Sequence, residues 1–156
     1  IPMLFREPDG SYSNPKHYPR ISLAQPATHD HPALAAMWAE CWGNIEAGIE
    51  VESNQRELQN IIRFAAMPDQ AAPRELTDQL HEAYTRAVMN SSSWLVVFQI
   101  QDVFAQTDRF NTPGSVSMKN WSHRLPSTVK QLDSTPHLLA KTKMFTRAAQ
   151  DSRRVI

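Results

Sequence analysis

The chain has little of several residues that mark other classes of protein. A single cysteine, Cys41, in 156 residues excludes an internal disulfide and fits a reducing compartment, so we expect a cytoplasmic protein. Lysine and arginine together number 16, as do aspartate and glutamate, which predicts neither a nucleic-acid partner nor a membrane partner. No apolar run is long enough to cross a bilayer, and the first residues lack the basic-then-apolar order of a secretory signal.

Glycine is also scarce, whereas proline is common. Four glycines against eleven prolines predict loops that are fixed in shape. The chain starts without methionine in an apolar run, residues 1–5, which predicts that it begins inside a larger protein. Its length allows one domain with a real core, and no repeat or change of composition marks a second, so we expect residues 1–156 to form a single domain.

Hydrophobic periodicity predicts short strands that alternate with helices. Apolar residues predict strands at 1–5, 21–23 and 94–98, and the uninterrupted last run is typical of a strand buried on both faces. Helices are predicted from the residues after Pro32 to Gly43, over 52–67, over 73–90 and from Pro136 onward, with a turn at 8–11 and a short helix or turn at 99–104. This alternation favours an α/β fold with a parallel sheet covered by helices.

One polar stretch, residues 27–32, lies between a predicted strand and the first helix. It contains a hydroxyl, two imidazoles and the carboxylate of Asp30. Asp30 therefore follows the carboxyl end of a strand, where α/β proteins bind their ligands. The alternative is structural: Asp30 caps the next helix, with Pro32 in its first turn. Taken by itself, the stretch favours the cap.

A second group of residues, later in the chain, resembles a known family when it is read together with the first. Thr28-His29-Asp30 is followed about seventy residues later by Gln101-Asp102, then by the run 110–114 (Phe-Asn-Thr-Pro-Gly) and by Asn120-Trp121. This order resembles the C-terminal part of the 4-α-glucanotransferases, the amylomaltases or disproportionating enzymes of glycoside hydrolase family 77. Ile1-Pro2-Met3, Asp9-Gly10 and Tyr18-Pro19 extend the resemblance over nearly the whole chain.

The resemblance implies both a fold and an activity. The fold is α/β, the helix-rich C-terminal portion of a (β/α)8 barrel with about strands 6–8, incomplete on its own. The activity is retaining transfer of α-1,4-glucan segments between maltooligosaccharides, with no cofactor and no metal. In that family the nucleophilic aspartate and the acid/base glutamate follow strands 4 and 5, so neither lies in this chain. The remainder of its own barrel is the implied partner, and the segment alone is expected to be inactive.

The resemblance also implies roles for individual residues. Asp30 matches the third catalytic carboxylate, which with His29 binds hydroxyls of the sugar at the cleaved bond, while Thr28 fixes the loop. The residues expected in or near the wall of the glucan cleft are Asn111, Pro113, Gly114 and Trp121. The alternative, that these four only shape and pack a loop, stays open.

Rival interpretations rest on single features. His29, Asp30 and His31 resemble a metal-binding run, although no second pair of histidines or cysteines supports it. Trp38 and Trp42, one helical turn apart, suggest sugar stacking or a helical interaction module without enzymatic activity, but their spacing favours a core.

Other single residues favour structural roles. Cys41 lies on the same apolar face as the two tryptophans, where a thiol is usually inert. His81 is predicted on a helix flank and not as a ligand. The last helix carries a basic face that we expect to be solvated, formed by Lys141, Lys143, Arg147, Arg153 and Arg154.

Overall fold

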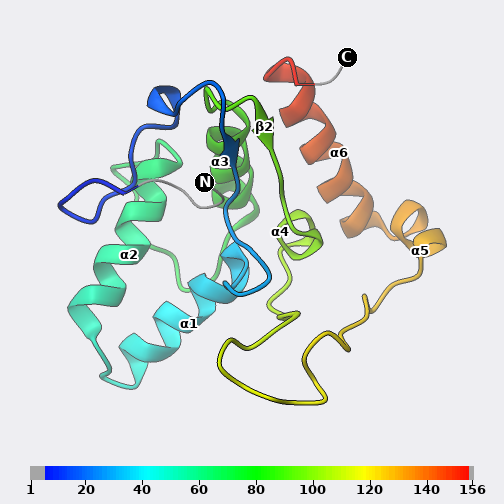
Figure 1. Ribbon diagram of the computed structural model, residues 1–156, viewed down its shortest axis with the longest axis horizontal. Coiled ribbons are helices and arrows are strands. Elements are labelled where there is room, and N and C mark those ends of the chain that lie inside the picture. The colour runs from blue at the N-terminus through cyan, green and yellow to red at the C-terminus, as the bar shows by residue number, and fades with distance from the viewer. Residues whose placement is uncertain (1–5, 155–156) are drawn as a thin grey trace.

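Helices make up most of the regular structure of residues 6–154, which the computed structural model describes (Figure 1). The helices are α1 (Leu34–Glu46), α2 (Val51–Phe64), α3 (Asp78–Met89), α4 (Ile100–Phe104), α5 (Val129–Ser134) and α6 (Pro136–Asp151), with the 3₁₀ turn η1 (Pro15–His17) and the strands β1 (Leu23–Ala24) and β2 (Leu95–Val96). The strand predicted at residues 1–5 lies outside the described range. None of the helices in that range is both long and apolar enough to cross a membrane.

The two strands pair in parallel, as the alternation of strands and helices predicted. Leu23 lies opposite Leu95 and Ala24 opposite Val96. The pairing continues past the strand ends, because the N–H of Trp94 donates to the carbonyl of Arg20 at 2.8 Å. The carboxyl ends of β1 and β2 therefore lie side by side, and each leads into a segment that reaches the candidate site.

The prediction of a strand over 94–98 buried on both faces is wrong. Only Leu95–Val96 is a strand, and the side chains of Trp94 and Leu95 are 79% and 51% exposed. Ile21, predicted to belong to the preceding strand, is exposed as well. An apolar run becomes buried on both faces only where a layer covers each of them. Because successive side chains of a strand point to opposite faces, the exposure of both Trp94 and Leu95 shows that the elements within residues 6–154 cover neither face completely at the start of β2.

The apolar core lies between α1, α2 and α3. Its fully buried side chains include Trp38 of α1, Ile61 of α2 and Leu80 of α3. The indole Nε1 of Trp38 donates to the carbonyl of Pro73 at 3.2 Å, so its polar atom is satisfied. The core prediction for Trp38 is confirmed, and Trp42 packs half-buried against the same cluster. A helical interaction face built on both indoles is therefore wrong.

Several helix ends differ from the predicted ones. Gly43 does not end α1, which continues to Glu46; a glycine inside a helix costs about 1 kcal/mol but keeps its hydrogen bonds. The turn that follows uses Gly48, whose φ is +72°. The third helix begins at Asp78 and not at Pro73, because the side chain of Thr77 accepts the N–H of Leu80 at 3.2 Å and caps it there.

The other two predicted helices lie close to their expected positions. The second ends at Phe64, before the predicted Met67, and Ala66 follows in the left-handed region. The last begins at Pro136, as predicted, with Thr135 as the residue before it.

A buried chain of polar groups joins α3, α4 and α6, and it corrects the prediction that His81 lies on a helix flank. His81 is buried, and the Nζ of Lys141 lies 3.0 Å from its Nδ1. An ammonium group only donates, so Nδ1 accepts and the ring proton is on Nε2. That Nε2 donates to the carbonyl of Asp102 at 2.7 Å. Lys141 also pairs with Asp78 at 2.6 Å.

The solvated basic face predicted for the last helix is therefore only partly present. The side chain of Lys141 lies against α3, and Arg154 donates to the carbonyls of Met89 and Ser91. Lys143 and Arg147 remain exposed. Two of the five predicted residues thus hold the end of the chain against α3 and do not form an outer surface.

Asp102 continues the buried chain to α1. Its carboxylate Oδ1 accepts the N–H of Leu34, the first residue of α1, at 3.0 Å, and the residue is 3% exposed. Burial raises the pKa of Asp102 to about 6, against the opposing effect of the N–H of Leu34. Burial, together with the charge of Lys141, lowers the pKa of His81 to about 4.

We expect the buried Trp38 and the exposed Trp94 to respond very differently to substitution. Replacing Trp38 by alanine should lower the free energy of unfolding by about 3–5 kcal/mol, because the indole leaves a cavity in the core. The matched variant Trp94→Ala should change it by less than about 0.5 kcal/mol, since that indole is mostly exposed. Urea unfolding of both variants measures the difference, and equal losses would contradict the placement of the core.

We also expect Asp102 and His81 to have opposite effects on the pH dependence of stability. The folded chain binds an extra proton at Asp102 between pH 4 and 6, so that group lowers stability as pH rises. It lacks a proton at His81 between about pH 4 and 6.5, so that group raises stability as pH rises. In the wild type the two contributions oppose each other.

The single variants should separate them. As the pH rises from 4 to 6, the free energy of unfolding of Asp102→Asn should increase relative to that of the wild type, by roughly 1–2 kcal/mol over the range. The free energy of unfolding of His81→Gln should decrease relative to that of the wild type, by a similar amount. Chemical unfolding at several pH values measures both slopes. Parallel profiles for the wild type and both variants would contradict these two pKa shifts.

Candidate functional site

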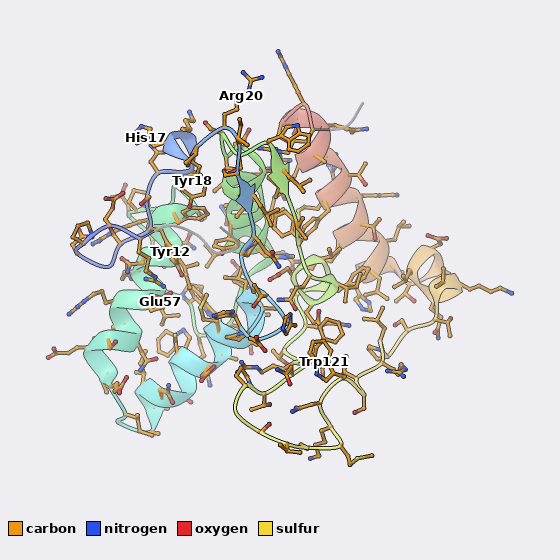
Figure 2. All side chains as sticks on the ribbon, viewed as in Figure 1. Tyr12, His17, Tyr18, Arg20, Glu57 and Trp121 are labelled. Atoms are coloured by element: carbon orange, nitrogen blue, oxygen red, sulfur yellow. The ribbon has the colours of Figure 1, made fainter. Side chains whose placement is uncertain are left out.

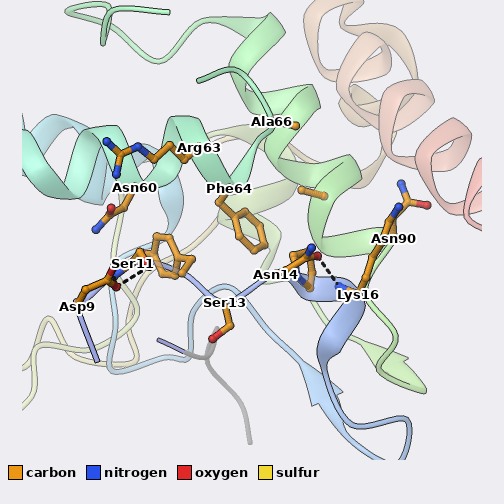
Figure 3. A pocket seen from close by; sticks show the side chains of 13 residues that line it. Asp9, Ser11, Ser13, Asn14, Lys16, Asn60, Arg63, Phe64, Ala66 and Asn90 are labelled. Carbon is orange, nitrogen blue, oxygen red and sulfur yellow. Dashed lines mark hydrogen bonds between the residues drawn. The ribbon is translucent and has the colours of Figure 1, made fainter. Parts of the chain in front are cut away.

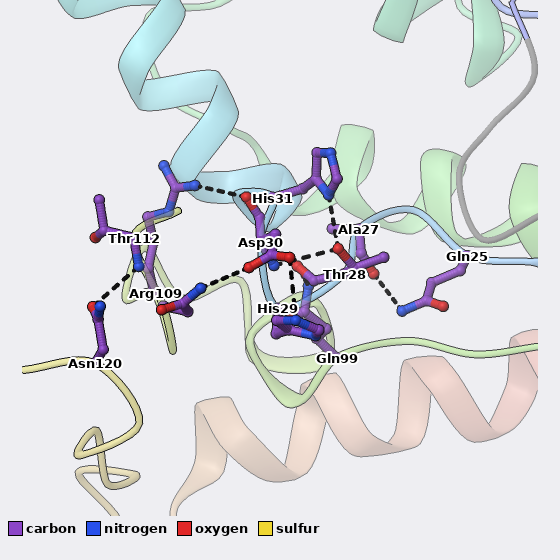
Figure 4. Close-up of polar contacts among 11 residues, drawn as sticks. Gln25, Ala27, Thr28, His29, Asp30, His31, Gln99, Arg109, Thr112 and Asn120 are labelled. Atoms are coloured by element: carbon purple, nitrogen blue, oxygen red, sulfur yellow. Dashed lines mark hydrogen bonds and ion pairs between the residues drawn. The ribbon is translucent and has the colours of Figure 1, made fainter. Parts of the chain in front are cut away.

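The stretch 27–32 forms a loop between β1 and α1, as predicted (Figure 4). The alternative that Asp30 caps the helix is wrong. The residue at the N-cap is Ala33, which has no side chain to accept a hydrogen bond, and Pro32 precedes it. The carboxylate of Asp30 lies instead against a distant loop: the Nδ2 of Asn111 donates to its Oδ1 at 2.6 Å across 81 residues of sequence.

Three donors from two loops surround Asp30. Besides Asn111, the Nε2 of His29 lies 3.2 Å from the carboxylate Oδ2, and the Nη2 of Arg109 donates to the backbone carbonyl of Asp30 at 3.1 Å. The side chain of Asp30 remains 43% exposed, so a ligand can reach the carboxylate. The group is thus held in place and still open to solvent. The contact of Arg109 with the backbone of Asp30 was not predicted from the sequence.

Trp121 reaches this site through its contact with His29. The two rings lie 5.0 Å apart between centroids at a tilt of 47°. Trp121 is 61% exposed, and its backbone N–H donates to the carbonyl of Phe110 at 2.7 Å. Figure 2 shows Trp121 on the loop between α4 and α5. Its φ is +62°, a conformation that bulky residues rarely adopt. The loop therefore holds an indole at the surface beside the imidazole that contacts Asp30.

Thr28 ties the first loop to itself. Its Oγ1 lies 2.7 Å from the Nδ1 of His31 and accepts the N–H of Asp30 at 3.3 Å. The carbonyl of Thr28 accepts the N–H of His31 at 2.9 Å. These contacts make a compact turn around the carboxylate.

The second loop is shaped by its own polar contacts. Asn120 Oδ1 accepts the N–H of Thr112 at 3.1 Å, and its Nδ2 donates to the carbonyl of Ser115 at 3.0 Å. Pro113 and Gly114 lie at the exposed tip that these bonds close, beyond Asn111. The structure thus gathers Thr28, His29, Asp30, Asn111 and Trp121 at one place, with Pro113 and Gly114 at the edge of the same loop.

Two rival interpretations lose support from this geometry. The ring of His31 is engaged with Thr28 while that of His29 is beside Asp30, and residues 6–154 contain no group of three histidine, cysteine or acidic side chains that could hold a metal ion. Cys41 is buried, and burial raises the pKa of its thiol to about 11, which leaves little thiolate for a nucleophilic reaction.

A separate cavity of about 560 Å³ lies between the loop 9–16, α2 and the end of α3 (Figure 3). The sequence did not indicate it, and none of its lining residues belongs to the site around Asp30. Several of its polar groups are engaged locally. Asp9 accepts from Ser11, Asn14 accepts the N–H of Lys16, and Asn90 donates to the carbonyl of Arg86. These side chains stabilise turns and helix ends.

Comparison with known proteins places the chain in a family of glucan-transferring enzymes. The sequence profile of the 4-alpha-glucanotransferase family matches residues 2–130. The chain belongs to the 4-alpha-glucanotransferase family, which confirms the resemblance read from the motifs.

Individual relatives agree with this assignment. The 4-alpha-glucanotransferase of Chlamydia pneumoniae is 24% identical over 136 residues, which are 81% of this chain and 23% of that protein. The crystal structure of amylomaltase from Corynebacterium glutamicum superposes with a TM-score of 0.67 at 18% identity, over 92% of this chain and 24% of that one.

A second solved structure is amylomaltase from Streptococcus agalactiae in complex with acarbose. Its TM-score is 0.53 at 18% identity, and the match covers 86% of this chain and 23% of that chain. The described chain therefore has the fold of part of an amylomaltase. It spans about a quarter of the length of the relatives that it matches.

We expect the Asp30–Asn111 hydrogen bond to appear as a coupling energy. In a double-mutant cycle, Asp30→Ala and Asn111→Ala should be non-additive by about 1 kcal/mol, since the bond is charged but partly exposed. The control cycle pairs Asp30→Ala with Asn120→Ala, whose amide bonds only its own loop, and should give a coupling near zero. Urea unfolding supplies both values, and equal couplings in the two cycles would show that the loops do not meet at Asp30.

Proposed function

We propose that this chain is the C-terminal part, about strands 6–8, of the catalytic barrel of a 4-α-glucanotransferase. In this proposal β1 and β2 are the seventh and eighth strands, and residues 1–156 are one incomplete domain. The nucleophile and the acid/base residue come from strands outside the chain. The family match over residues 2–130 and the relatives' names support the assignment of the enzyme class.

One observation carries the proposal: two loops far apart in sequence meet at an accessible carboxylate. The loop after β1 and the loop after α4 contribute Asp30 and Asn111, whose side chains are 2.6 Å apart. Parallel strands bring such loops together at their carboxyl ends, where barrel enzymes bind their substrates. The acarbose complex of the relative from Streptococcus agalactiae supports a glucan-like ligand.

The proposed role of Asp30 is to stabilise the transition state. Retaining transfer of a glucosyl unit passes through an oxocarbenium-like state, and hydrogen bonds to ring hydroxyls strengthen as that charge develops. Asp30 accepts such hydroxyls, and His29 lies beside it to bind the same sugar. Asn111 holds the carboxylate in position until a sugar hydroxyl takes its place on Oδ1. A preorganised group of this kind lowers the activation free energy by about 3–4 kcal/mol.

Trp121 is proposed to form the apolar part of the cleft wall. An exposed indole can pack against the face of a glucosyl ring, and its contact with His29 places that surface next to Asp30. Pro113 and Gly114 shape the rim of the same wall. The substrates are α-1,4-glucans such as maltooligosaccharides.

The exposed apolar side chains of the sheet support the barrel interpretation. Ile21, Trp94 and Leu95 lie uncovered beside the paired strands. Burial of such residues is favourable by about 25 cal/mol per Å². We propose that the remainder of the same barrel covers them.

Substitution of Asp30 in the complete enzyme that carries this chain tests the proposal. Asp30→Asn keeps the shape and the bond to Asn111 possible but removes the charge, and we expect kcat for glucose release from maltotriose to fall at least about a hundredfold. The control is Asp133→Asn, an exposed aspartate of α5, which should retain full activity.

Two outcomes would contradict the proposal. Unchanged transfer by Asp30→Asn would remove Asp30 from the mechanism. Transfer by the isolated 156-residue chain would show that the chemistry does not depend on groups elsewhere. Binding of maltodextrin by the complete protein without transfer would favour the alternative, a glucan-binding module without enzymatic activity.

A further inference from the structure

The loop that carries Asp30 is held at both ends by one short segment that starts α4. At its first end, the Nε2 of Gln99 donates to the carbonyl of Thr28 at 2.8 Å, across 71 residues of sequence (Figure 4). At its far end, the Oδ1 of Asp102 accepts the N–H of Leu34 at 3.0 Å, across 68 residues. Gln99 and Asp102 are three residues apart, so one helical turn at the start of α4 contacts both ends of the loop.

The contact made by Asp102 replaces a cap that α1 lacks. The first N–H groups of a helix have no partners within it, and a side chain near the N-cap normally accepts one of them. Ala33 occupies the N-cap and has no acceptor on its side chain. Because the acceptor comes from α4, the position at which α1 begins is fixed relative to the end of β2.

The segment is itself anchored away from Asp30. His81 of α3 donates to the carbonyl of Asp102 at 2.7 Å, and Lys141 of α6 bonds the other nitrogen of that imidazole at 3.0 Å. Lys141 is in turn paired with Asp78 at 2.6 Å. None of these contacts involves a residue that touches Asp30. The anchors therefore connect the loop with two helices that contribute nothing directly to the site.

We propose that Gln99 and Asp102 are positioning residues, which hold the loop 28–34 so that the carboxylate of Asp30 meets the glucosyl ring. This inference rests on the proposed function of Asp30. A group that stabilises a transition state through hydrogen bonds must lie within a fraction of an ångström of its productive place. Loss of either contact releases one end of the loop while the other contacts of Asp30, to His29 and Asn111, remain.

Kinetics of four variants of the complete enzyme test this inference. Gln99→Glu keeps the size of the side chain but removes the donor to Thr28, and Asp102→Ala removes the acceptor for Leu34. We expect each to lower kcat for maltotriose about tenfold or more, with KM changed less than about threefold, because the affected contacts strengthen only in the transition state. Asp102→Asn keeps an oxygen that can accept the same N–H, so this variant should retain most of the wild-type activity that Asp102→Ala loses. Gln150→Glu, an exposed glutamine of α6, is the control for Gln99→Glu.

A double variant distinguishes positioning from general loss of stability. If Gln99 acts through Asp30, then Gln99→Glu should lower kcat little further once Asp30→Asn is present. A purely structural role predicts the same fold-loss in both backgrounds, together with a lower Tm, and that result would overturn the inference. Full kcat in both Gln99→Glu and Asp102→Ala would overturn it as well.

The inference and the proposed function fail in different ways. If Asp30→Asn abolishes transfer while Gln99→Glu and Asp102→Ala do not lower kcat, only the proposed positioning role is contradicted. If Asp30→Asn is fully active, both the proposed function of Asp30 and the positioning role that rests on it are contradicted.

Discussion

The hydrogen bond from the N–H of Leu34 to the buried carboxylate of Asp102 is the contact on which the arrangement of the chain depends. It joins the start of α1 to α4, two elements that are adjacent in space and 68 residues apart in sequence. The backbone of Asp102 is held at the same time by His81, so α3 meets the same point. Burying a carboxyl there opposes its ionisation, as its raised pKa shows. The benefit is a fixed geometry between the two segments that follow β1 and β2.

That fixed geometry explains how loops without regular structure can present a defined set of polar groups. The chain between α4 and α5, residues 105–128, contains no helix or strand (Figure 1). Asn111 and Arg109 of this loop nevertheless reach Asp30 at hydrogen-bonding distance. The side chain of Asn120 closes the tip of this loop from within, and Trp121 takes an uncommon backbone conformation beside it. A scaffold of helices with loops above it is the usual way in which proteins position a site.

Local patterns in the sequence predicted the elements but not their environment. Apolar spacing indicated α1, α2, α3 and α6, and the order of strand, polar loop and helix around Asp30 was right. Gly43 failed as a helix end because tertiary packing of α1 on α2 outweighs a local preference. The buried roles of His81 and Lys141 could not be read from the sequence, since the contacts of Lys141 on α6 with His81 and Asp78 on α3 join residues 60 and 63 positions apart. The exposure of Trp94 likewise depends on which layers cover a strand, a property that no local pattern contains.

The motifs predicted which residues lie together better than the chemistry of single residues did. Taken alone, Asp30 looked like a helix cap, and only its combination with the run around Asn111 pointed to a shared site. The structure joins those two residues. Asp102 belonged to the motif that carried the resemblance, but its bond to Leu34 was not predicted, and Gln99 and Arg109 gave no signal of their own, because each of the three acts through a long-range contact. The most direct measurement of the central claim is a crystal structure of the complete enzyme with bound acarbose. We expect a sugar-ring hydroxyl within hydrogen-bonding distance of the Asp30 carboxylate and a ring packed against Trp121. Acarbose bound elsewhere, with the Asp30–Asn111 bond intact and the indole bare, would contradict it.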